Sequence, residues 1–236
     1  MNKSIFFLAL VLTICCKSNS IDNKLEKLGA YDKQVKIVKL SSTSKEIVFV
    51  PMVHFAVEDF YTDVKKKIDS LNNLGYFFYC EEITTKDSDS ITLRKYKKLK
   101  GVPFSKNARY KQLIDSIYKL KYSVKIMDQP TYSVLGIDSL NGRNVDVSLN
   151  DIIIYYESRY GEIKLYDCDF KTSLFQKSIC NEKPINEKIK NSVFIDFRNR
   201  NVVTSLSTDR HQKIAIIYGS NHLKGIKEEL LKQGFK

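Results

Sequence analysis

A strand–helix–strand succession near the start of the chain limits what it can fold into more than any other feature. Residues 46–50 and 76–80 are almost entirely apolar, which is typical of short strands buried on both faces of a sheet. Between them, residues 58–73 carry apolar side chains at the spacing of one helix face, and Gly75 follows where a helix cap is expected. Strand, helix and strand joined by short loops imply parallel pairing. We therefore expect an α/β fold, with helices packed around a mixed central sheet and a site at the carboxyl ends of its strands.

Further elements are predicted along the rest of the chain. Residues 34–38 are expected to form a hairpin with residues 46–50, and residues 213–218 are the clearest strand in the sequence. The remaining expected elements are a strand over 122–127 and helices over 88–100, 111–120, 148–160, 185–207 and the C-terminal residues. No internal repeat and no Pro/Gly-rich linker interrupts this pattern, so we expect one domain over residues 31–236.

The N-terminal residues have the pattern of an export signal. Lys3 precedes an unbroken apolar stretch over residues 5–14, which meets Cys15 and Cys16 and is followed by polar residues. An apolar run that ends at a cysteine is typical of a bacterial lipoprotein signal, in which that cysteine becomes the lipidated N-terminus. We expect residues 1–15 to be the signal and 16–30 a tether, with either Cys15 or Cys16 carrying the lipid. The protein would then be exported and anchored to a bacterial membrane.

Composition and charge exclude several classes of protein. Of the 236 residues, 43% are hydrophobic and 28% are charged, which argues against a disordered chain, a collagen-like fibre or a polytopic membrane protein. The net charge of +12 is spread over short lysine clusters, without a basic arm, a zinc finger or an RNA-binding aromatic signature. We therefore expect a lysine-rich surface and no nucleic-acid partner.

The cysteines outside the signal indicate a disulfide rather than a zinc site. There are three, Cys80, Cys168 and Cys180, and none belongs to a Cys-x-x-Cys motif. In an exported chain the closest pair, Cys168 and Cys180, is the natural candidate for a disulfide, which leaves Cys80 free.

Two of the three histidines occupy equivalent places. His54 and His222 each come four residues after the end of a predicted strand, and Glu81 and Glu82 directly follow another. Because such positions converge in an α/β sheet, these side chains could share acid/base work or hold a divalent metal. Neighbouring residues of an extended chain point in opposite directions, so only one glutamate should face the site. A histidine at a strand end can equally be a structural hydrogen-bonding group, and His211 lies in a polar loop and is expected to be solvated.

The two ends of the predicted domain resemble the TraB/GumN/TIKI family. Its members have two Gly-x-x-His motifs, an acid after the second strand, an Arg-Asn pair on the helix before the last strand, and a terminal helix that closes on a glycine and an aromatic residue. The residues that match the second motif and the ending are Gly219, His222, Leu223, Gly225, Gly234 and Phe235. The resemblance covers residues 46–83 and 197–235.

The remaining family positions are carried over with two qualifications. Arg200-Asn201 matches the Arg-Asn pair best, and Arg198-Asn199 is an immediate rival. Pro51 stands where the first motif has glycine. Proline has a fixed φ and no N–H, so we expect the first loop to differ in shape from that of the family.

The resemblance implies a metal-dependent, peptidase-like hydrolase that acts on a peptide or small-molecule substrate. His54, His222 and Glu81 or Glu82 would hold Mn, Co, Fe or Zn, whose charge lowers the pKa of bound water. Arg200, beside Asn201, would stabilise the developing oxyanion or a substrate carboxylate, or would form a structural ion pair with the motif acid.

Two alternatives stay open, because the broader superfamily includes erythromycin esterases and haem-binding lipoproteins. One is a metal-independent hydrolase in which a motif histidine is the general base. The other is a lipoprotein that binds a ligand in the same cleft without catalysis.

Overall fold

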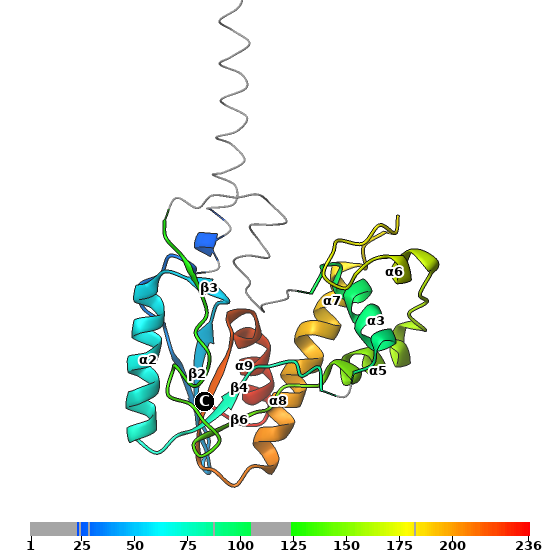
Figure 1. Ribbon diagram of the computed structural model, residues 1–236. Coiled ribbons are helices and arrows are strands. Elements are labelled where there is room, and N and C mark those ends of the chain that lie inside the picture. The colour runs from blue at the N-terminus through cyan, green and yellow to red at the C-terminus, as the bar shows by residue number, and fades with distance from the viewer. Residues whose placement is uncertain (1–22, 24, 28, 87, 105–123, 182) are drawn as a thin grey trace, which may run out of the picture.

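The computed structural model describes residues 23, 25–27, 29–86, 88–104, 124–181 and 183–236 (Figure 1). The expected signal, both candidate lipidation sites (Cys15 and Cys16), part of the tether and the predicted helix over 111–120 lie outside the described residues. Within the described ranges, every helix is too short or too polar to cross a membrane.

A five-stranded sheet forms the centre of the fold, in the order β1-β2-β7-β4-β6. The strands are β1 (Val38–Ser41), β2 (Glu46–Met52), β4 (Phe77–Cys80), β6 (Gly142–Asn144) and β7 (Lys213–Gly219). β1 is antiparallel to β2, and all other pairs are parallel, so the predicted mixed α/β sheet is confirmed. The two strands of the predicted βαβ unit, β2 and β4, are parallel but not adjacent, because β7 lies between them.

Helices cover both faces of this sheet (Figure 1). They are α2 (Glu58–Asn73) on one face, and α8 (Phe197–Thr208) and α9 (Leu223–Lys232) on the other. Alternate residues of β7 show that this central strand is buried on both faces of the sheet. Ala215 and Ile217 pack in the cluster under α2, whereas Ile214 and Ile216 pack under α8 and α9. All four are fully buried, which explains why residues 213–218 carry no polar alternation.

A group of helices beside the sheet has a core of its own, which includes Leu99, Leu149, Ile152 and Val193. It consists of α3 (Ser90–Lys100), α5 (Leu149–Tyr160), α6 (Asp167–Lys171) and α7 (Glu187–Asn191). Ser148 begins α5 with a capping box, as a serine before an apolar helix predicts. α7 continues through a π-helical segment (Ser192–Asp196) into α8, so the helix predicted over 185–207 runs from the helical group to the sheet.

Two predicted elements are wrong in extent. The first strand of the hairpin, predicted over 34–38, is β1 (Val38–Ser41). Of the strand predicted over 122–127, the described part pairs only at β5 (Met127–Asp128), with β3 (Phe55–Ala56), in a separate two-stranded sheet. The place beside β4 in the main sheet is taken instead by the short strand β6. Gly142 permits this pairing, because a Cβ atom there would lie 2.6 Å from a methyl carbon of Ile137.

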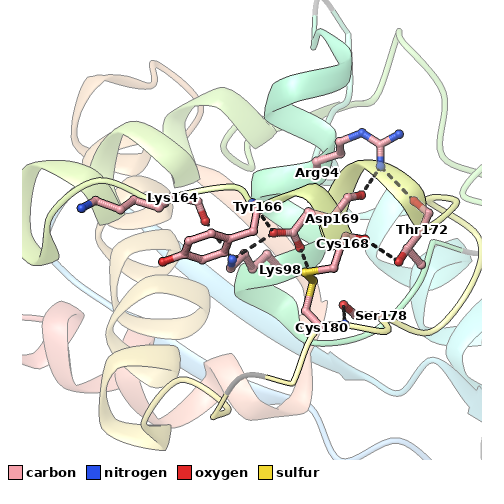
Figure 2. The surroundings of a disulfide bond; sticks show 9 residues. All are labelled: Arg94, Lys98, Lys164, Tyr166, Cys168, Asp169, Thr172, Ser178 and Cys180. Atoms are coloured by element: carbon pink, nitrogen blue, oxygen red, sulfur yellow. Dashed lines mark hydrogen bonds and ion pairs between the residues drawn. A yellow bond between two sulfur atoms is a disulfide. The ribbon is translucent and has the colours of Figure 1, made fainter.

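The predicted disulfide between Cys168 and Cys180 is confirmed, with the two Cα atoms 5.4 Å apart (Figure 2). It ties α6 to the loop that follows, and Asp169 beside it forms an ion pair of 3.0 Å with Lys98 of α3. Cys80 is free and buried, as expected, and burial raises the pKa of its thiol to about 12.

We predict that Asp209 stabilises the fold at neutral pH and ceases to do so in acid. Its carboxylate accepts hydrogen bonds from the Tyr79 hydroxyl (2.6 Å) and the Arg143 guanidinium (2.8 Å). Burial by itself would raise the pKa of Asp209, but hydrogen bonds from Tyr79 and His211 outweigh it and lower the pKa from 3.8 to about 2. A carboxyl group whose pKa is lower in the folded state stabilises the fold at pH values above its ordinary pKa. This contribution is lost as the pH falls from 3.8 towards 2.

Urea unfolding at several pH values measures this effect. Asp209→Asn should lower the free energy of unfolding at pH 7 by about 1–3 kcal/mol, and the difference from the wild type should vanish near pH 2. The control is Asp69→Asn, which removes an exposed pair with Lys65 and should cost a few tenths of a kcal/mol, roughly. If the free energy of unfolding of Asp209→Asn were lower than that of the wild type by the same amount at pH 2, the role of the ionised Asp209 would be contradicted.

Candidate functional site

A cavity of about 770 Å³ lies where the helical group meets the carboxyl edge of the sheet. His54 follows β2, Glu81 and Glu82 follow β4, and His222 follows β7, and all four line this cavity. The parallel register brings them together, because β2, β7 and β4 end at the same edge. The structure therefore gathers at one site the histidines and acids that the sequence singled out.

Glu81 lies at the centre of a buried network. Its carboxylate accepts hydrogen bonds from the guanidinium of Arg198 and from the backbone N–H of Gly219. The Tyr132 hydroxyl holds the backbone of Glu81 from both sides, by accepting from its N–H (2.9 Å) and donating to its carbonyl (2.8 Å). Burial alone would raise the pKa of Glu81, but the charge of Arg198 and the hydrogen bond from the backbone N–H of Gly219 hold it well below the usual range. Glu81 is therefore ionised.

Glu82 differs from Glu81 in its surroundings. It also lines the cavity. The chain leaves the regular strand conformation after Cys80, and strand alternation then no longer applies. Glu82 stays outside the buried network and is exposed to solvent.

Arg198 uses all five of its N–H donors within the protein. Nε and Nη2 donate to the two carboxylate oxygens of Asp146, and Nη2 also donates to Glu81. Nη1 donates to the carbonyl of Phe194 (3.2 Å) and lies 3.1 Å from Nε2 of His222. Its side chain is 8% exposed and that of Asp146 is 0% exposed. Arg198 is therefore a buried cation between two buried anions, with no donor left for a substrate.

His222 is held at both ring nitrogens. Nδ1 lies 2.7 Å from the amide oxygen of Asn199, which can only accept, so the proton is on Nδ1. Nε2 then has a lone pair, which accepts from Arg198, and it lies 3.5 Å from the Glu81 carboxylate. His222 is 2% exposed, so it contributes a buried edge of the cavity.

The preferred Arg-Asn assignment is corrected by the structure. Arg200 donates to the Tyr155 hydroxyl (2.7 Å), and Asn201 donates to the carbonyl of Val145 (2.7 Å). Neither lines the cavity, whereas Arg198 does and Asn199 holds His222. The physical reason is the helix period: two positions along an α-helix turn the side chain by roughly 200°, onto the opposite face.

His54 stands at the mouth of the cavity on the loop between β2 and β3. Its backbone carbonyl accepts from Gln129 (2.9 Å), which joins this loop to the chain beyond β5. The imidazole is accessible to solvent in the cavity, but the protein around it removes part of its hydration, and this burial lowers the pKa of His54. Pro51 lies within β2, opposite Tyr218 of β7 and beyond Phe49, where the pairing of β2 with β1 ends.

Asp146 is the site residue that sequence reasoning missed. It follows β6, a strand of three residues that gives no periodic signal. His211 lies outside the cavity, stacked on Phe77 with 4.1 Å between ring centroids, and is half-exposed as expected.

The donor atoms do not form a metal-binding group in their present positions. Among the described residues, the only set of three ligand atoms within bonding range of one ion is Cys168, Asp169 and Cys180, whose sulfurs form the disulfide. Nε2 of His222, the nitrogen nearest Glu81, faces the guanidinium of Arg198, which is cationic at any physiological pH. The residues as arranged therefore do not fit the divalent cation that the family resemblance implies.

Comparison of the chain with protein-family models, with curated proteins and with solved structures found no match.

We predict that Gly225 is required for the bond between Asn199 and His222. A Cβ atom at position 225 in α9 would lie 2.2 Å from Nδ2 of Asn199, closer than any non-bonded contact allows. Gly225→Ala should therefore displace the Asn199 amide and lower the free energy of unfolding by about 1–3 kcal/mol, although alanine is the better helix former. Urea denaturation measures the change.

Two variants test this cause. Lys224→Ala, at an exposed neighbouring position of α9, should leave stability nearly unchanged. In the double variant Asn199→Ala with Gly225→Ala, the clash is absent, so the second substitution should add no further loss. A full additional loss in the double variant would show that Gly225 acts through another contact.

Proposed function

We propose that this protein is a hydrolase whose cavity activates water with His54 as the general base. The observation that carries the proposal is that His54 shares one cavity with the ionised Glu81 and its buried partners. The lowered pKa of His54 keeps the imidazole neutral at pH 7, and a neutral imidazole can accept a proton. A cavity of about 770 Å³ has room for a substrate of the size of a short peptide or an ester of a small acid.

The roles of the residues follow from their charges. His54 would take a proton from water as that water attacks a carbonyl carbon, and would return the proton to the leaving group. The negative charge of Glu81 favours the imidazolium that forms in this step. Arg198 and Asp146 keep Glu81 ionised and in place, and thus act as positioning residues.

The metal-dependent form of this hydrolase remains a prediction from the family resemblance. A bound divalent cation would lower the pKa of a water ligand, with His54, His222 and Glu81 as its ligands. It would require His222 to give up its contact with Arg198, so no step above depends on it.

A second candidate is a ligand-binding lipoprotein that does not catalyse a reaction. The observation in its favour is that the donors of Arg198 and both nitrogens of His222 are satisfied within the protein. Because all hydrogen bonds of this network are made within the protein, the network could also serve only as a rigid wall of a binding cavity.

His54→Ala is the variant that separates these candidates. If His54 is the general base, kcat/KM on a panel of aryl esters and short peptides should fall by about 10²- to 10⁴-fold, with folding unchanged by circular dichroism. His211→Ala is the matched control, because His211 lies outside the cavity. Equal activity of the two variants would exclude His54 as the base. Assays with EDTA and with added Mn²⁺, Co²⁺ or Zn²⁺ show whether a metal is needed.

We also propose that the protein is exported and anchored to the membrane by a lipid. The sequence up to Cys15 and Cys16 is the reason, and the disulfide is in keeping with an oxidising compartment. Mass spectrometry of the protein from its native membrane should find an acylated N-terminal cysteine at one of these two positions. A mature form that begins elsewhere without a lipid would contradict the proposal.

A further inference from the structure

The cavity contains a cation that the described residues do not balance. Lys100, the last residue of α3, lines the cavity, and the contact found for its ammonium is with the Tyr96 ring, 5.7 Å from the centroid. The other cations of the cavity have anionic partners: Arg198 lies between two carboxylates, and Lys190 is 3.3 Å from Glu187. Among the described residues, Lys100 has no such carboxylate.

The position of Lys100 at the end of a helix does not by itself explain why this residue lines the cavity. Lysines in the last turn of a helix are favoured by the helix dipole, and Lys97 and Lys98 share that turn. Both of them point elsewhere, to the carbonyl of Ser173 (2.8 Å) and to Asp169 (3.0 Å). Lys100 alone of these three lines the cavity.

The surroundings of Lys100 favour an anion. Its side chain is half-buried, and burial and the charge of Arg198 lower its pKa. An ammonium group that has lost part of its hydration is stabilised when an anion comes into contact with it. The same charge acts on His54, so an anion at Lys100 lies near the general base of the proposed function.

The wall around Lys100 is mostly apolar. Side chains from the helical group and the loop after α3 form it: Tyr96, Val102, Phe104, Leu149, Phe194 and Ile195. A cavity of this size in which an apolar wall faces polar groups on the other side is typical of a site for a small organic molecule.

We propose that Lys100 binds the carboxylate of an amphipathic ligand whose apolar body lies against this wall. The proposal rests on the proposed function only in taking this cavity as the substrate site. It names the substrate class as a carboxylic acid with an aromatic or aliphatic body. Lys100 is then the residue that selects for the negative charge.

Calorimetric titration of the full-length protein with 4-phenylbutyrate and with its uncharged amide, 4-phenylbutyramide, tests the proposal without turnover. The wild type should bind the carboxylate about tenfold more tightly or better, because the amide can still accept a hydrogen bond from the ammonium but has no negative charge to attract it. Lys100→Met should abolish this preference, and Lys100→Arg should keep it. Lys190→Met, which removes a balanced cation of the same cavity, should also keep it.

The outcomes separate this proposal from the hydrolase proposal. Equal affinity of the wild type for the two ligands, no binding of either, or a preference that survives in Lys100→Met would overturn the role of Lys100. A preference that depends on Lys100, in a protein without hydrolytic activity, would support the role of Lys100 and leave the ligand-binding candidate in place of the hydrolase.

Discussion

The buried guanidinium of Arg198 is the interaction on which the site end of this fold depends. It joins the end of β4 through Glu81, the chain after β6 through Asp146, and the start of α9 through His222. Removing it would leave two carboxylates buried without a counter-charge, a loss of about 3–5 kcal/mol for breaking a buried pair. Three segments that are distant in sequence are thus joined to α8 by one side chain.

The site therefore consists of two sets of residues, one bonded within the protein and one facing the cavity. The network behind the cavity wall is satisfied internally and sets the position and charge of Glu81. The groups that can meet a ligand are those that face the cavity from other elements, His54 on the loop after β2 and Lys100 at the end of α3. The family resemblance includes residues of both sets, Glu81 and His222 in the first and His54 in the second, but it does not include Lys100.

Much of the fold could be predicted, because buried strands and amphipathic helices leave periodic patterns in sequence. The βαβ unit, the capped helix after Ser148 and the disulfide are examples. The convergence of His54, Glu81 and His222 could also be predicted, since it follows from parallel strands ending at one edge. The choice between Arg198 and Arg200 could not, because both lie on α8 and only the packing of that helix decides which face meets the sheet.

The sequence by itself determined the class of fold, the sheet edge that carries the site and the pairing of Cys168 with Cys180. These depend on local periodicity and chain connectivity, and both can be read directly from the sequence. Tertiary structure decided that β7 enters between β2 and β4, that Asp146 is the second partner of Arg198, and that Lys100 faces the cavity. Each of these depends on contacts between segments far apart in the chain, where no local pattern distinguishes one partner from another.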